Sequence, residues 1–130
     1  MTAQAETGEV SGNVAFVNDG GVQGVWSPDR SGNAINFSTA PLRGYVDICV
    51  TVPLTRTYTI RANVRGPNGS SNSWWMTIDQ HAGPARKVSF EAHPLYQDIV
   101  AHRVTLSAGE HIIRFWVRDD GTYLDRISLS

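Results

Sequence analysis

Apolar and polar side chains alternate along several short stretches of the chain, as they do in β-strands that bury one face. Residues 112–118 show this most clearly, because Ile113, Phe115 and Val117 fall on one side while the arginines and the tryptophan fall on the other. The same alternation predicts strands at 44–52, 57–65 and 73–79. Further strands are predicted at 3–6, 13–18, 23–27, 86–90, 99–106 and 124–129.

The residues between these stretches favour turns and loops. Gly, Pro and Asn gather at 27–33 and 66–72, and proline cannot donate to a strand ladder. No stretch carries the i, i+3, i+4, i+7 apolar stripe of a helix. Many short strands separated in this way predict an all-β fold, an antiparallel β-sandwich or jelly roll. Without linkers or internal repeats, residues 1–130 are predicted to form a single domain.

Composition and charge narrow the possible functions. Of 130 residues, 41% are hydrophobic and 18% are charged, which is ordinary for a globular protein. The formal net charge of −1 argues against nucleic acid or a membrane surface as a partner. The single cysteine, Cys49, excludes an internal disulfide and a cysteine-based zinc site. No apolar run reaches the roughly 20 residues of a membrane helix, and no signal-peptide pattern opens the chain.

The polar sides of three predicted strands suggest a binding surface. If strands 57–65, 73–79 and 110–118 share a sheet, one outer face carries Arg61, Arg65, Trp75, Thr77, Arg114, Trp116 and Arg118. Aromatic rings stack on the C–H face of a sugar, and guanidinium groups bind carboxylates or sulfates in pairs of hydrogen bonds. This face therefore predicts an acidic glycan such as alginate, pectin or a sulfated polymer. The alternative is a solvated outer face whose tryptophans cover neighbouring strands.

A second candidate site lies where loops are expected to converge. The 27–33 loop beside Trp26, the segment 68–73 and the turn 118–123 fall at the same edge of a sandwich if adjacent hairpins alternate in direction. Asp119 and Asp120 are also good turn residues, so they serve the turn whether or not they contact a ligand.

The chain resembles the β-sandwich carbohydrate-binding modules of families 6 and 35. The resemblance is carried by Leu106-Ser107-Ala108-Gly109-Glu110-His111-Ile112-Ile113-Arg114-Phe115 and by Arg118-Asp119-Asp120-Gly121-Thr122-Tyr123-Leu124-Asp125-Arg126-Ile127. It extends to Ala5–Gly8, Gly44–Ile60 and Asn68–Trp75. It implies a secreted, monomeric, lectin-like module that binds a polysaccharide or oligosaccharide and is joined to a polysaccharide-degrading enzyme.

The resemblance also implies particular site residues. A ligand in the loop cleft would contact Trp26, Asn72, Arg118, Asp120 and Tyr123, although these families often have asparagine at the position of Tyr123. A structural Ca²⁺ would be held by Glu6 in the first strand and Asp125 in the last, with carbonyl oxygens from residues 19–33. Gln4 stands where these families commonly have another acid. Alternatively, Asp125 forms a surface ion pair with Arg126 or Arg103.

The sequence gives little support for catalysis. His81, His93, His102 and His111 lack metal-ligand spacing, and His111 falls on an apolar face, as a core histidine would. Asp119 and Asp120 are neighbours in one turn rather than a pair flanking a glycosidic bond. A non-catalytic module is therefore expected. The alternatives are a protein-binding adhesion domain or, with less support, a small polysaccharide lyase that uses the face bearing Trp75 and Trp116.

Overall fold

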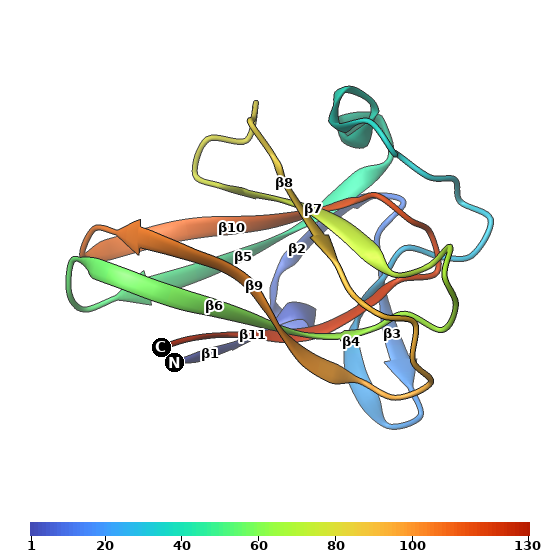
Figure 1. Ribbon diagram of the computed structural model, residues 1–130, viewed down its shortest axis with the longest axis horizontal. Helices are drawn as coiled ribbons and strands as arrows, with labels where there is room; N and C mark the ends of the chain where they lie inside the picture. Colours follow the sequence, from blue (N-terminus) through green and yellow to red (C-terminus); the bar gives the residue numbers. More distant parts are fainter.

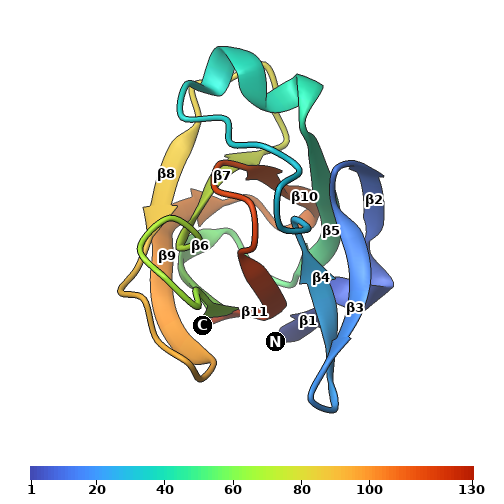
Figure 2. The same ribbon diagram turned by 90° about the vertical axis from the view of Figure 1, so that its right-hand side faces the viewer.

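The alternating stretches form two antiparallel sheets in the computed structural model, which describes residues 1–130. Sheet A has the order β3 (Ala15–Asp19), β4 (Val22–Trp26), β11 (Tyr123–Leu129), β6 (Arg56–Arg65) and β9 (Gln97–Leu106), with β1 (Thr2–Gln4) paired to β11. Sheet B has the order β2 (Glu9–Gly12), β5 (Gly44–Val52), β10 (Gly109–Val117), β7 (Ser73–Ile78) and β8 (Arg86–Ser89). Figures 1 and 2 show the two layers facing each other. The predicted all-β antiparallel sandwich is confirmed.

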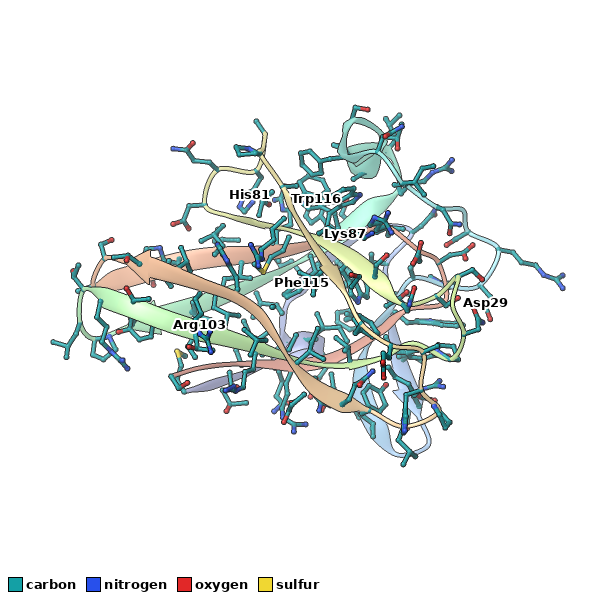
Figure 3. All side chains as sticks on the ribbon, viewed as in Figure 1. Asp29, His81, Lys87, Arg103, Phe115 and Trp116 are labelled. Carbon is teal, nitrogen blue, oxygen red and sulfur yellow. The ribbon has the colours of Figure 1, made fainter.

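The core lies between the sheets and is built from the predicted inner faces. Sheet B contributes Val46, Ile48, Val50 and Val52 from β5 and Ile113, Phe115 and Val117 from β10. Sheet A contributes Tyr58, Ile60, Ala62 and Val64 from β6. In Figure 3, Phe115 points between the layers whereas its neighbour Trp116 points to the outer side of sheet B. Alternation along β5, β6 and β10 thus predicted the buried side correctly.

Two short 3₁₀ helices were not predicted from the sequence. They are η1 (Ala5–Thr7) and η2 (Phe37–Leu42), and neither is long enough to show an apolar stripe. η2 lies outside sheet B, at the top of Figure 2. The two chain ends meet beside β11, where the amino group of Met1 donates to the carbonyl of Leu129 at 2.9 Å. None of the helical segments is long and apolar enough to cross a lipid bilayer.

The expectation that strands 57–65, 73–79 and 110–118 share a sheet is wrong. β6 belongs to sheet A, where it pairs with β11 and β9, whereas β7 and β10 are neighbours in sheet B. Arg61 and Arg65 therefore lie on the opposite outer surface from Trp75, Arg114 and Trp116. The physical reason is that alternation fixes which side of a strand is buried but not which strand becomes its neighbour.

Candidate functional site

The outer face of sheet B does not expose its indoles as predicted. Trp116 is only 4% exposed, and its ring meets Phe37 at 5.5 Å and Tyr45 at 5.0 Å between centroids, both edge to face. Its Nε1–H donates to the Thr77 hydroxyl at 2.9 Å. Trp116 is thus part of a small second core beneath η2, and the prediction of a solvent-exposed Trp116 is wrong.

Trp75 is only partly exposed at the edge of the same cluster. Its Nε1–H donates to the carbonyl of Ala34 at 2.6 Å, and its ring lies 6.1 Å from that of Phe37. Ala34 and Ala40 are buried against Trp116. The segment 34–42 therefore forms a roof over this part of sheet B, which no alternation pattern in the strands could reveal.

The two predicted arginines on sheet B are already engaged by carboxylates. Arg114 donates to Asp47 through Nε at 2.5 Å and Nη2 at 2.8 Å, and it stacks 3.6 Å from the ring centroid of Tyr45. The hydrogen bonds that Arg114 donates to Asp47 raise the pKa of Arg114. Arg118 donates to the Ser73 hydroxyl at 2.8 Å and lies 3.8 Å from Asp119. An acidic glycan would have to compete with these intramolecular partners.

The polar loop residues named from the resemblance hold the loops together. The side-chain amide of Asn72 donates to the carbonyl of Phe90 at 2.7 Å. The carboxylate of Asp120 accepts a hydrogen bond from the backbone N–H of Gly32 at 3.0 Å. The backbone N–H of Asp120 donates to the side-chain oxygen of Asn33 at 2.9 Å. Asn72 and Arg118 do border a polar hollow of about 620 Å³, but the structure does not bring Trp26 or Tyr123 to it.

Trp26, Tyr123 and Arg65 do come together, on the outer face of sheet A. Tyr123 is paired in register with Trp26 on β4 and with Arg65 on β6. The indole and phenol rings are stacked at 5.1 Å with 23° between their planes. The guanidinium of Arg65 lies 4.0 Å from the centroid of the Tyr123 ring. Three strands thus align one aromatic pair and one cation in a single row.

Two further residues complete this group and were missed by the sequence reading. Tyr96 places its ring 6.4 Å from that of Tyr123, and Asp19 accepts a hydrogen bond from Arg65 Nε at 2.7 Å. Tyr96 precedes β9 in a stretch whose pattern predicted no element, so its position as an aromatic just before a strand was the only indication. We call Asp19, Trp26, Arg65, Tyr96 and Tyr123 the aromatic cluster.

A hollow of about 310 Å³ lies beside the aromatic cluster. Its walls are the turn between β3 and β4 and the segment 94–96, with Asp19, Arg65 and Tyr96 among its lining residues. Burial, followed by the charge of Asp19, raises the pKa of Tyr96, and burial likewise raises that of Tyr123. Although burial alone lowers the pKa of Arg65, the hydrogen bond and charge of Asp19 outweigh it and raise the net value. Both phenols therefore stay protonated and Arg65 stays charged at physiological pH.

The rest of the outer face of sheet A is open and carries cations without acidic partners. Arg61 on β6 lies beside Val100, which is 48% exposed, and neither Arg61 nor Arg103 has a carboxylate within ion-pair distance. Arg103 makes one long contact, 3.3 Å from its Nε to the Thr59 hydroxyl. Figure 3 shows Arg103 on the side of the molecule away from Trp116. Aromatic rings and unpaired arginines are therefore combined on sheet A.

The two residues suggested for calcium, Glu6 and Asp125, both lie near Gly24 on β4. The expectation that Glu6 lies in the first strand is wrong, because β1 ends at Gln4 and Glu6 belongs to η1. Its buried oxygen Oε2 has no hydrogen-bond partner, and Glu6 lines a surface hollow of about 360 Å³ together with Asn18 and Gly24. Gly24 lies against Asp125, since a Cβ built at Gly24 would be 3.1 Å from Asp125 Cα. Asp125 is 7% exposed and contacts Arg126, the expected alternative partner.

The unpartnered oxygen of Glu6 is of the type that a hard cation binds. An unpartnered buried carboxylate oxygen is costly unless a cation or donor satisfies it, and Ca²⁺ takes carboxylate, amide and carbonyl oxygens together. No group of three or more His, Cys, Asp or Glu side chains is arranged to hold a metal ion, so the remaining ligands would be amide or carbonyl oxygens.

This two-sheet sandwich is shared with known carbohydrate-binding modules. The chain superposes on the family 35 carbohydrate-binding module from Clostridium thermocellum with a TM-score of 0.71 and 18% identity, over 99% of this chain and 95% of that one. It superposes on the module CBM6cm-2 of Cellvibrio mixtus lichenase 5A, solved with cellotriose, with a TM-score of 0.67 and 23% identity, over 100% and 95% of the two chains.

A larger enzyme contains the same fold. The chain matches the GH26-CBM35 β-(1,4)-mannanase of Podospora anserina with a TM-score of 0.75 and 16% identity, over 100% of this chain but only 27% of the mannanase chain. No protein-family model matches the chain, and no curated protein matches it significantly in sequence. At these identities the likenesses establish the fold, so the ligand has to be inferred from the residues on the surface.

Proposed function

We propose that this protein is a non-catalytic carbohydrate-binding module and that the aromatic cluster is its sugar platform. The observation that carries the proposal is the row of Trp26, Tyr123 and Arg65 on an outer sheet face, next to Tyr96 and a hollow. Stacked aromatic rings offer apolar area to the C–H face of a sugar, and their polar tips and the guanidinium offer hydrogen bonds to its hydroxyls. The shared fold of modules from families 35 and 6 supports this assignment.

We further propose an acidic glycan, such as an alginate- or pectin-like uronate polymer or a sulfated glycan. Support comes from Arg61 and Arg103, which lack carboxylate partners on the same face as the platform. Arg61 is four residues from Arg65 along β6, roughly 13 Å at the usual rise of a strand. An oligosaccharide stacked on the platform can extend over this distance and bring its anionic groups to both arginines.

A bound Ca²⁺ ion and an attached enzyme are also part of the proposal. Glu6 and Asp125 would hold the ion and tie η1 to β11, which would stabilise the terminal strands. Weak sugar binding gains strength when a module is tethered to a polysaccharide-degrading enzyme, and such a pairing would act outside the cell. The mannanase match, in which this fold occupies 27% of a longer chain, supports that arrangement.

Affinity electrophoresis through gels containing alginate, polygalacturonate or neutral galactomannan tests the proposal. Trp26→Ala should abolish retardation, whereas Leu54→Ala, a change at a 63% exposed residue in the turn between β5 and β6, should leave it unchanged. Arg61→Gln should weaken retardation by the acidic polymers but not by the neutral one.

Two outcomes would refute the proposed function. Equal retardation of the wild type and Trp26→Ala would exclude the platform. No retardation by any glycan, together with a concentration-dependent dimer in light scattering, would instead favour a protein-binding adhesion domain.

A further inference from the structure

The hollow beside the aromatic cluster contains polar groups that the protein leaves unpaired. The guanidinium of Arg65 makes one hydrogen bond, from Nε to Asp19 Oδ2, so the N–H groups on its two terminal nitrogens have no protein acceptor. The other carboxylate oxygen of Asp19, Oδ1, accepts no hydrogen bond from the protein. The hydroxyl of Tyr96 is buried and makes no hydrogen bond of good geometry, but it lies close enough to Asp19 and Arg65 for both to affect its pKa. Free donors and a free acceptor therefore stand together at one hollow of about 310 Å³.

The charges at this hollow favour a neutral group over an anion. Arg65 and Asp19 are 17% and 24% exposed, and they cancel each other at 2.7 Å. A carboxylate or sulfate placed on Arg65 would also lie close to the charge of Asp19, which disfavours it. Tyr96 and Tyr123 add no charge, because burial raises the pKa of each phenol. The hollow thus differs from the surface at Arg61 and Arg103, where neither guanidinium has a carboxylate within ion-pair distance.

Two adjacent sugar hydroxyls match this arrangement. Each hydroxyl is both a donor and an acceptor, so one can donate to Asp19 Oδ1 while its neighbour accepts from the terminal nitrogens of Arg65. Both hydrogen bonds involve a charged partner, which makes them stronger than bonds between neutral groups. Pro94 and Leu95 line the same hollow, and Leu95 is 67% exposed, so an apolar wall is available for the carbon face of the ring.

We propose that the hollow is a recognition pocket for an unsubstituted vicinal diol of one sugar unit, read by Asp19 and Arg65. This inference rests on the proposed function, because it assigns a specificity to the same glycan-binding surface. A uronate polymer can occupy both the pocket and the surface at Arg61 and Arg103, since its rings carry adjacent hydroxyls as well as carboxylates. One unit would present its diol to the pocket while other units present carboxylates to Arg61 and Arg103.

The experiment compares glycans that differ at the hydroxyls or at the carboxylates. The probes are alginate, its O-acetylated form and its methyl ester, with galactomannan and O-acetylated galactomannan as the neutral pair, all in affinity gels. The inference predicts that O-acetylation weakens binding about 10- to 100-fold, the loss expected for hydrogen bonds to charged groups. Methyl esterification should also weaken binding, but for another reason: it removes the carboxylate charges that Arg61 would contact.

Three variants separate the two effects, and a fourth serves as a control. Asp19→Asn and Arg65→Lys should lose the preference for non-acetylated over acetylated glycan, and Arg61→Gln should keep it. Asp98→Asn removes another acid from the same face, one that accepts a hydrogen bond from Asn63, and should behave as the wild type. Melting curves establish that each variant is folded.

The outcomes distinguish this inference from the proposed function. If a glycan retards the wild type and acetylation makes no difference, or if Asp19→Asn keeps the full preference, the diol pocket is refuted while the carbohydrate-binding function stands. If no glycan retards the wild type, both are refuted.

Discussion

Replacing Trp116 by alanine should destabilise the fold rather than remove a sugar contact. The indole is 4% exposed, touches Phe37 and Tyr45, and donates to Thr77. Truncating a buried tryptophan costs about 3–5 kcal/mol through lost burial and the cavity it leaves. The Thr77 hydroxyl also loses its donor, which adds roughly 0.5–1.5 kcal/mol. Since domains of this size have only about 5–15 kcal/mol of stability, the loss should be a large part of the total.

Urea unfolding followed by tryptophan fluorescence and circular dichroism measures this loss. We expect a lower midpoint with an unchanged slope, and a melting temperature lower by roughly 10–20 °C. Trp116→Phe keeps most of the ring and should lose only about 1 kcal/mol, for the missing N–H donor. Folded Trp116→Ala protein should still bind glycan in the cold. A stability loss under about 1 kcal/mol together with abolished binding would refute the buried role and restore the sheet B face as a binding surface.

Two further predictions concern ionisable groups. His111 donates to the Ser107 carbonyl and contacts Asp79 at 2.6 Å, and these two interactions raise its pKa. The stability that His111 contributes is therefore fully present below the pKa of an unfolded histidine, about 6.5, and is lost as the pH rises through the higher pKa of the folded state. The melting temperature should therefore fall above that pH in the wild type but not in His111→Gln; parallel curves would contradict this. For calcium, chelator should lower the melting temperature of the wild type and added Ca²⁺ should restore it, whereas Glu6→Gln should respond to neither. A wild-type melting temperature indifferent to chelator would exclude a structural ion.

His111 and Trp116 show which side-chain environments could be predicted from the sequence. His111 was expected to be a satisfied core histidine, and it is 8% exposed with both ring nitrogens within hydrogen-bond distance of a partner. Trp116 was correctly assigned to the side of β10 opposite Phe115, but that side was expected to face solvent. The difference is that His111 lies on the inner side, whose burial follows from the sandwich itself. Burial of Trp116 depends on Phe37, which belongs to η2, a segment outside the sheets.

The residues of the aromatic cluster were likewise predicted only in part. Trp26 and Tyr123 were expected to lie together at the loop edge, and the structure stacks them. Arg65 was expected beside Arg114, yet they lie on different sheets because β6 pairs with β11 and not with β10. Tyr96 joins the cluster from a stretch without regular structure, so no periodic pattern pointed to it.

The sequence by itself determined most of the strands, the turns between them and the inner faces of β5, β6 and β10, because these follow from local alternation and from residues that favour turns. It did not determine β2, which was not predicted as a strand. Only the tertiary structure decided which outer face is open to solvent. The roof at 34–42 covers the indoles of sheet B, while the cluster on sheet A assembles side chains from β3, β4, β6 and β11 with Tyr96. Contacts between residues distant in sequence made both choices, and such contacts leave no periodic mark along the chain.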